Sequence, residues 1–246
     1  MARIELRDAT IRIKDGLSGT AAIDEPSTAP VATDTSFDID SISLNTTVTD
    51  LVPIGARFTV AGETDATTVH TVTARTPTSG TTTNITFTPA LGAGTYADDG
   101  VITFLPQQVE VKLGDGNLTW TVNKEYEYLL DRGNLDTVRE GDQQPMDVVL
   151  DSVYEQITTG TSETITPYDA MNGVGSASEW VSSSSDACEP YAVDIEVVHS
   201  QSCGTAQDET TLLPDFRYES LESDLSAATL SFTGRCNAVK PTVTRS

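Results

Sequence analysis

The sequence predicts a mainly β protein, and three features lead to this prediction. Short runs in which apolar and polar residues alternate recur along most of the chain, and this is the period of a half-buried strand. Clusters of Gly, Pro, Asp, Asn and Ser separate these runs, as turns do between strands. Helix start signals stand out only near 167–173, where Thr166 can cap, Pro167 suits the first helical position and Asp169 favours the positive helix end. A second helical turn is possible near Trp180.

The N-terminal third of the chain divides into three parts. Ile4, Leu6, Ile11 and Ile13 indicate two strands or one long bent strand, and the small, polar, Pro-containing stretch 17–36 is typical of a linker. From residue 36 to residue 105, Thr becomes frequent and Lys is absent. This part contains the short β-type runs "ISLNTTV", "RFTVAG", "HTVTART", "TNITFTP" and "GVITFLP". They predict a small β-barrel or sandwich module, inserted into a larger β domain.

The larger domain resumes near residue 107. The stretch 107–123 predicts a hairpin with a Gly-Asp-Gly turn, and further strands are expected at 125–130, 146–155, 191–199 and 227–236. The intervening segment 131–145 is polar and charged, and we expect a long loop there. The tail after Cys236 is expected to be loosely ordered. The predicted domains are therefore a core domain of residues 1–35 and 106–246 and a module of residues 36–105.

Charge and hydropathy limit the classes of function. The chain has 246 residues, a net charge of −23 and a sequence pI near 4.1, so its surface repels nucleic acid. The N-terminus lacks the apolar core of a secretory signal, and no apolar run approaches the ~20 residues that span a membrane. We therefore expect a protein that is made and folded in a cytoplasm, without a membrane partner.

No catalytic motif appears in the sequence, so we expect no enzyme and no cofactor. The 37 carboxylates leave open an acidic β-sandwich hydrolase, although nothing selects two of them as a catalytic pair. A zinc site would need Cys188, His199, Cys203 and Cys236, whose spacings are long and irregular. The favoured interpretation is that these cysteines are buried or free thiols without a functional role. The second choice is a disulfide between two of them.

Several stretches resemble one family. "GDGNLTWTVNKEYEYLLDRGNLDTVREGDQQPMDVVLDSVYE" (114–155) is similar to the middle of the major tail tube proteins of long-tailed, siphovirus-type bacteriophages. "RIELRDATIRIKDG" (3–16) resembles their opening strands. "CEPYAVDIEVVH" (188–199) and "LLPDFRYESLESDLSAATLSFTGRCN" (212–237) resemble their closing segments. The resemblance covers most of residues 1–20 and 107–240, and the Thr-rich module departs from it.

The resemblance implies a tail-tube-type β-sandwich or barrel with a flanking helix. Six copies would form a ring around a channel, and stacked rings would conduct DNA from capsid to host. Implied partners are further copies of the chain, a tape measure protein, a tail terminator and baseplate or tail-tip proteins, assembled in the host cytoplasm into the virion tail. The module 36–105 would lie on the outer surface. An alternative is a β-rich adhesin or decoration protein that binds a cell or capsid through this module.

Two groups of residues become candidates on this basis. The charged loop would contact the next ring through Asp131, Arg132, Gly133, Asn134, Leu135, Asp136, Arg139, Glu140, Gly141 and Asp142. Carboxylates that alternate with the apolar face of their strands would line the channel, where they repel DNA and let it slide. These are Glu125, Glu127, Asp147, Asp151 and Glu155.

Overall fold

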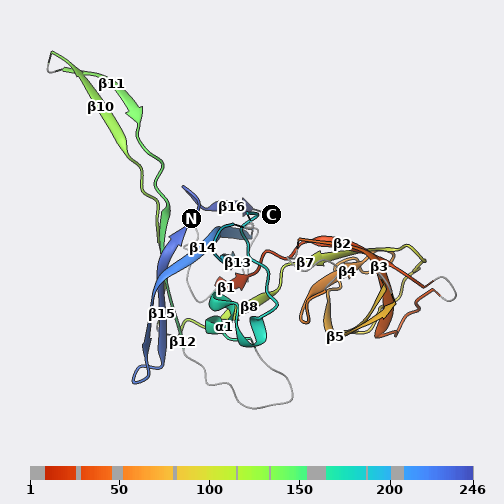
Figure 1. Ribbon diagram of the computed structural model, residues 1–246. Helices are drawn as coiled ribbons and strands as arrows, with labels where there is room; N and C mark the ends of the chain where they lie inside the picture. The colour runs from red at the N-terminus through yellow and green to blue at the C-terminus, as the bar shows by residue number, and fades with distance from the viewer. Residues whose placement is uncertain are drawn as a thin grey trace. The chain divides into compact units, whose positions relative to one another are not determined.

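The chain is mainly β, as the sequence predicts. The computed structural model describes residues 9–25, 29–45, 52–79, 82–114, 116–132, 134–153, 165–186, 188–200 and 208–245 (Figure 1). Within these ranges the helical elements are α1 (Pro167–Asn172) and the 3₁₀ turn η2 (Gly175–Ala177). The hydroxyl of Thr166 accepts a hydrogen bond from the Asp169 N–H at 3.1 Å, which confirms the predicted cap.

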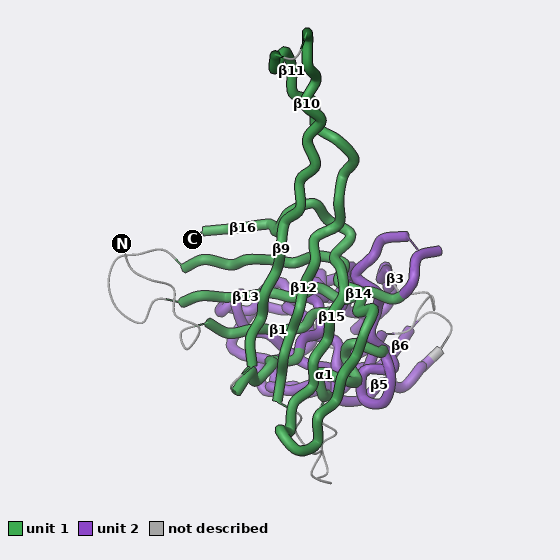
Figure 2. Tube along the Cα trace, turned by 90° about the vertical axis from the view of Figure 1, so that its left-hand side faces the viewer, with its two compact units in different colours: residues 1–14, 109–172, 191–246 green, residues 15–108, 173–190 purple. Residues whose placement is uncertain are grey.

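The chain divides into two compact units (Figure 2). The sheet unit contains residues 1–14, 109–172 and 191–246, and the barrel unit contains residues 15–108 and 173–190. The strands of the sheet unit are β1 (Ala9–Lys14), β8 (Gln108–Val111), β9 (Leu118–Thr121), β10 (Tyr126–Asp131), β11 (Asn134–Glu140), β12 (Met146–Val153), β13 (Val193–His199), β14 (Glu209–Asp224), β15 (Thr229–Cys236) and β16 (Thr242–Arg245). Those of the barrel unit are β2 (Gly19–Ile23), β3 (Ser36–Leu44), β4 (Arg57–Val60), β5 (His70–Ser79), β6 (Thr82–Thr88) and β7 (Val101–Leu105).

In the sheet unit, strand β14 pairs with two different groups of strands. The main sheet has the order β8-β1-β13-β14-β15-β12-β9, and β16 also pairs with β14. The first half of β14 pairs with β13 and β16, and its second half pairs with β15. Figure 2 shows that β1 and β13 run across the direction of β9, β12 and β15. The sixteen-residue β14 thus changes direction to serve both groups.

The bend in β14 has identifiable causes. The pairing with β13 shifts register opposite Asp194, where β14 contains Pro214 and a left-handed Asp215 with φ of 51°. The Asp194 carboxylate accepts a hydrogen bond from the Asp215 N–H at 2.9 Å, so this amide keeps a partner outside the ladder. On the other side, a Cβ at Gly234 would lie 2.1 Å from the Arg217 carbonyl oxygen. Glycine therefore permits the close approach of β15 to β14.

The core of the sheet unit follows the alternation of its strands. In β12 the residues at 146, 148, 150 and 152 are buried, and those between them are partly exposed. The same alternation along β15 buries Leu230, Phe232 and Cys236. Helix α1 contributes Ala170 and Met171 to the buried set.

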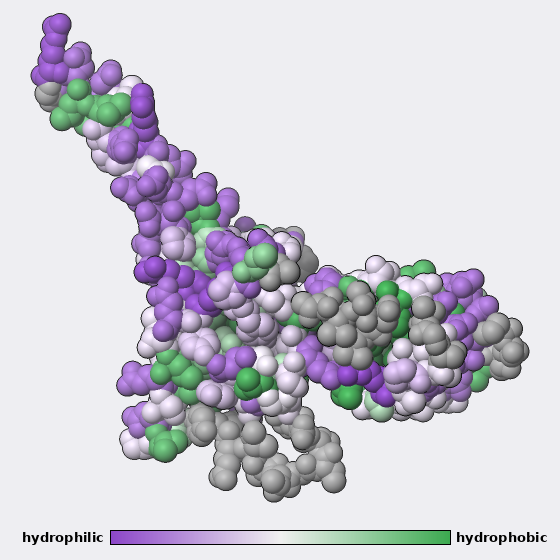
Figure 3. All heavy atoms as spheres, in the orientation of Figure 1, coloured by the Kyte–Doolittle hydropathy of each residue, from purple (hydrophilic) through white to green (hydrophobic). Residues whose placement is uncertain are grey.

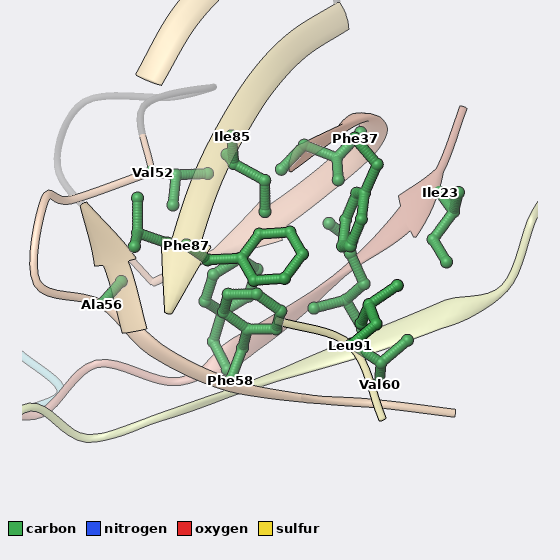
Figure 4. Close-up of a cluster of buried hydrophobic side chains, with 14 of the residues drawn as sticks. Ile23, Phe37, Val52, Ala56, Phe58, Val60, Ile85, Phe87 and Leu91 are labelled. Carbon is green, nitrogen blue, oxygen red and sulfur yellow. The ribbon is translucent and has the colours of Figure 1, made fainter. Parts of the chain in front are cut away.

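The barrel unit is a closed barrel with the strand order β2-β3-β6-β5-β4-β7. Its centre is a cluster of aromatic rings, in which Phe87 lies 4.9 Å from Phe37 and 5.4 Å from Phe58 between ring centroids (Figure 4). All three side chains are nearly inaccessible to solvent. Such rings bury a large apolar area, so we attribute much of the stability of this small unit to them.

The domain boundaries differ from those predicted at 36–105. The sequence predicts a linker at 17–36, but this stretch contains β2, which closes the barrel between β3 and β7. The small side chains of "GTAAI" conceal this strand at the level of sequence. The barrel unit also includes residues 173–190, which come from a distant part of the sequence. Buried Asp15 joins three parts of this unit, because its carboxylate accepts hydrogen bonds from the N–H groups of Leu17, Gln107 and Val181.

Two other expectations for the larger domain are wrong. β8 and β9 do not form a hairpin and lie at opposite ends of the strand order. The tail is not loose throughout, since β16 pairs with β14 through Glu209–Leu212. Alternation identifies the buried face of a strand but not its neighbour, and this explains the first error.

Candidate interaction surface

Strands β10 and β11 form an arm that projects from the main sheet (Figure 1). They pair antiparallel from Tyr126 opposite Glu140 to Asp131 opposite Asn134, with a register shift after Leu129. All residues of both strands that the structure describes are exposed. The predicted long loop 131–145 is therefore wrong in its secondary structure: most of it is the second strand of a hairpin.

The arm continues the ladder between β9 and β12. Thr121 lies opposite Asp147 at the end of that ladder, and the Gly141 N–H donates to the Glu125 carbonyl at 2.9 Å just before the arm begins. Between these two points, the Asn123 amide donates to the Asp147 carboxylate at 2.7 Å. The arm is thus the outer half of one long two-stranded ribbon, whose regular pairing is interrupted between Thr121 and Glu125. Hydrogen bonds on both sides of this interruption connect the arm to the main sheet.

One face of the arm is apolar. Along β10, Tyr126, Tyr128 and Leu130 alternate onto the same face. Val138 lies opposite Tyr128, and Leu135 lies opposite Leu130, so both belong to this face as well. Their exposed fractions are 46% and 60% for the two tyrosines, 63% for Leu130, 73% for Leu135 and 56% for Val138. Figure 3 shows apolar surface near the tip of the arm, surrounded by polar residues.

The other face of the arm is mainly polar. Glu127 lies directly opposite Arg139, and Leu129 lies opposite Thr137. Asp136 is the extra residue at the register shift. Arg132 adopts a left-handed conformation with φ of 51° in the turn. The arm therefore combines an apolar face with charges of both signs.

The structure locates nine of the ten residues predicted for ring contact along this arm. Asp131 ends β10, and Arg132 begins the turn. Asn134, Leu135, Asp136, Arg139 and Glu140 belong to β11, Gly141 and Asp142 follow it, and Gly133 lies outside the described residues. Sequence reasoning misses the apolar half of the surface. The alternation of Tyr126, Tyr128 and Leu130 is visible in the sequence, but such a face is normally buried in a core, and no local signal shows that it is exposed.

The outer face of the main sheet contains two of the predicted channel residues. Asp147 and Asp151 alternate with buried residues of β12 and therefore face away from the core. The guanidinium Nε of Arg235 lies 3.0 Å from the Asp147 carboxylate, and another of its nitrogens lies 3.7 Å from Glu219. Asp151 accepts a hydrogen bond from the Ser231 hydroxyl. Arg235 thus places a positive charge within the acidic surface that the sequence predicts for the channel.

The predicted channel residues therefore occupy two places. Asp147 and Asp151 lie on the main sheet, Glu127 lies on the arm, and Glu125 lies at the base of the arm, where its carboxylate accepts a hydrogen bond from Gln144 at 3.3 Å. Glu155 is outside the described residues.

The cysteines differ in their environments. Cys236 is buried and free, and its burial raises the thiol pKa to about 12, with a further contribution from the carboxylates of Asp194 and Asp215. Cys188 is exposed and free, and Cys203 lies outside the described residues. Within the parts of the chain that the structure describes, no group of three or more His, Cys, Asp or Glu residues could hold a metal ion.

Comparison with known proteins finds no matching family model, no similar curated protein and no similar solved structure. In the described part of the chain, no helix combines the length and the apolar character needed to cross a membrane.

Proposed function

We propose that the chain is a structural subunit of a phage tail tube, which assembles into hexameric rings that stack around a channel for DNA. The exposed apolar face of the arm carries this proposal. Five large apolar side chains on a projecting hairpin are unfavourable in water, and burying each one fully is worth about 1.5–3 kcal/mol. An isolated two-stranded hairpin is also only marginally stable by itself. A partner that covers this face removes both disadvantages.

A second copy of the same chain is the partner that accounts for most observations. The main sheet ends in β8 and β9, so a closed ring of sheets can cover these ends. The arm continues the ladder beside β9, so contacts along the sheet end and along the arm can belong to one continuous interface. The resemblance of residues 114–155 to tail tube proteins selects the same segment.

The acidity of the chain is compatible with a DNA channel. Its net charge of −23 opposes DNA binding, and carboxylates on the outer sheet face would let DNA slide without adhering. The remaining proposed partners are a tape measure protein inside the tube, a tail terminator and baseplate or tail-tip proteins. The proposed location is the tail of the virion, after assembly in the host cytoplasm.

The test is electron microscopy of the purified protein, together with sedimentation analysis. Rings or tubes are expected for the natural sequence. Tyr128→Ser combined with Leu130→Ser should abolish stacking, because it removes two side chains from the apolar face of the arm. Leu129→Ser combined with Thr137→Ser is the matched control on the opposite face. Monomers at every concentration, or tubes that both double variants form equally well, would contradict the proposal.

A further inference from the structure

Strand β9 at the end of the main sheet leaves a tryptophan partly uncovered. Leu118 and Trp120 are two residues apart in β9, so their side chains lie on the same face of the strand. Leu118 is 7% exposed and Val148, which lies opposite Trp120, is 0% exposed, so this face belongs to the core. Trp120 itself is 39% exposed. Among the described strands only β12 pairs with β9, and the indole therefore lies where the cover of the core ends.

The backbone of Trp120 also points to the open edge of β9. The Asp151 N–H donates to the Asn117 carbonyl at 2.8 Å, so these two residues form a hydrogen-bonded pair of the antiparallel ladder. Such pairs alternate along a ladder, so the N–H and C=O of Trp120 point away from β12. The outward N–H of Leu118 donates to the side-chain oxygen of Asn117 at 2.9 Å. The described part of the chain provides no comparable acceptor for the Trp120 N–H.

Trp120 begins a line of apolar residues that continues into the arm. Val122 is the next residue with the same even spacing, and it is 38% exposed. Tyr126 continues this spacing into the apolar face of the arm. Trp120, Val122 and the apolar face of the arm are together called the apolar stripe below. The contact surface of the arm thus extends onto the edge of the main sheet.

The size of the apolar stripe indicates a protein partner. From their exposed fractions, its seven side chains present roughly 700 Å² of surface. The largest apolar patch of a typical monomer is about 300–600 Å², whereas a stable interface takes about 800 Å² from each partner. The arm meets a second copy of the chain under the proposed function, and Trp120 lies on the strand path that leads into the arm. A second copy can therefore cover the whole stripe in one interface.

We propose that Trp120 is a central residue of the contact between copies, where an extended segment of a second copy pairs with the open edge of β9 and covers the indole. This inference rests on the proposed function and adds a site on the main sheet to the contact made by the arm. An extended segment fits this edge because its backbone can bond the outward N–H and C=O of Trp120 while its side chains pack on the indole.

The first experiment follows the fluorescence of Trp120 while the full-length chain with Trp180→Phe assembles. The chain has two tryptophans, so this substitution leaves Trp120 as the source of the signal. Assembly should shift the emission to shorter wavelength and reduce quenching by acrylamide, because the indole leaves water. Rings or tubes with unchanged emission and quenching would overturn the inference and leave the proposed function standing. Failure of the natural sequence to form rings or tubes would contradict both.

A pair of substitutions on β9 tests the contribution of the indole. Trp120→Thr removes the ring and keeps a residue that favours strands, and it should raise the concentration needed for assembly by about 30-fold, as loss of a central interface residue does. Thr119→Ala is the matched control, because Thr119 is exposed on the opposite face of the same strand. Equal effects of the two substitutions would overturn the proposal.

Hydrogen exchange of the natural sequence keeps the test decisive if a tryptophan variant does not fold. The Trp120 amide should exchange fast in the isolated chain and slowly in rings or tubes, because a strand of a second copy then accepts its hydrogen. Mass spectrometry with fragmentation to single residues measures this amide. Equally fast exchange of the Trp120 amide in the assembled protein would exclude an added strand at this edge.

Discussion

Arg75 and Glu179 form a bidentate ion pair across 104 residues of the chain. Each of two guanidinium nitrogens of Arg75 lies 2.8 Å from a different carboxylate oxygen of Glu179. The same carboxylate accepts the Ile54 N–H at 2.7 Å. This pair fastens the segment 173–190 to the barrel strands and so explains how a distant part of the sequence belongs to the barrel unit.

Glu179→Gln should destabilise the barrel unit by about 1–2 kcal/mol, because the charge-assisted pair is lost while the side chain keeps its size. The estimate is reduced for the partial exposure of Glu179, whose side chain is 34% accessible. Denaturant unfolding, followed by Trp180 fluorescence with Trp120→Phe present, measures the loss. Asp99→Asn removes an exposed charge from the same unit and should change little. Equal effects of the two substitutions would mean that net charge, and not the pair, determines the loss.

Gly234→Ala should destabilise the sheet unit by about 2–3 kcal/mol, because the new methyl group would collide with the backbone of β14. The neighbouring Thr233→Ala is the control, since Thr233 is exposed on the opposite face of β15. Denaturant unfolding followed by circular dichroism compares the two variants. If Gly234→Ala were no less stable than Thr233→Ala, the close approach of β15 to β14 would be wrong.

The thiol of Cys236 should resist alkylation in the folded protein at pH 8, because its pKa of about 12 leaves almost no thiolate and its side chain is buried. Exposed Cys188 should react readily under the same conditions. Mass spectrometry of labelled peptides distinguishes the two sites, and labelling in denaturant confirms that both peptides are detectable. Rapid labelling of Cys236 in the native protein would contradict its burial.

Assembly should strengthen as salt rises, because copies that each carry −23 charges repel one another. Screening shortens the range of this repulsion from about 30 Å at 0.01 M to about 8 Å at 0.15 M ionic strength. Arg235→Gln should raise the salt needed for assembly, since Arg235 lies between Asp147 and Glu219 on the outer sheet face. Light scattering across a salt series provides the measurement.

Arg245→Gln supplies the matched control for the salt experiment, because it removes the same charge from an ion pair with Glu209 at another part of the sheet. An equal shift for both arginine variants would mean that net charge alone matters. Assembly that weakens with salt would show that attraction between opposite charges, and not repulsion among carboxylates, controls the contact between copies.

Sequence alone is most informative where strands are short and their turns are marked. The runs at 57–60, 82–88 and 101–105 are strands of the barrel, as predicted. The sequence is least informative for β14, in which Pro214 and several charged residues obscure the alternation of apolar and polar residues. The bend of this strand depends on contacts with Asp194 and Gly234, which are distant in sequence.

The candidate site is also only partly predictable. The segment that forms the arm is unusual in the sequence, because it is charged and lies between two strands. Its second strand escapes prediction, since "NLDTVRE" is polar at most positions. The pattern of Tyr126 and Tyr128 is detectable, but whether a patterned face contacts a core, solvent or another chain depends on the tertiary structure.

The sharing of β14 has a consequence for cooperativity. Because each half of this strand hydrogen-bonds to a different group of strands, neither group can separate without disturbing the same continuous backbone. Local opening of one group of strands therefore disturbs the strand that supplies hydrogen bonds to the other group. Amide hydrogens of β13 and of β15 should exchange with solvent at similar opening free energies, close to that of global unfolding. The amides of the arm have no such shared strand, so their hydrogens should exchange with solvent much faster in the isolated chain. Slower exchange of these amides in the assembled protein would then measure assembly directly.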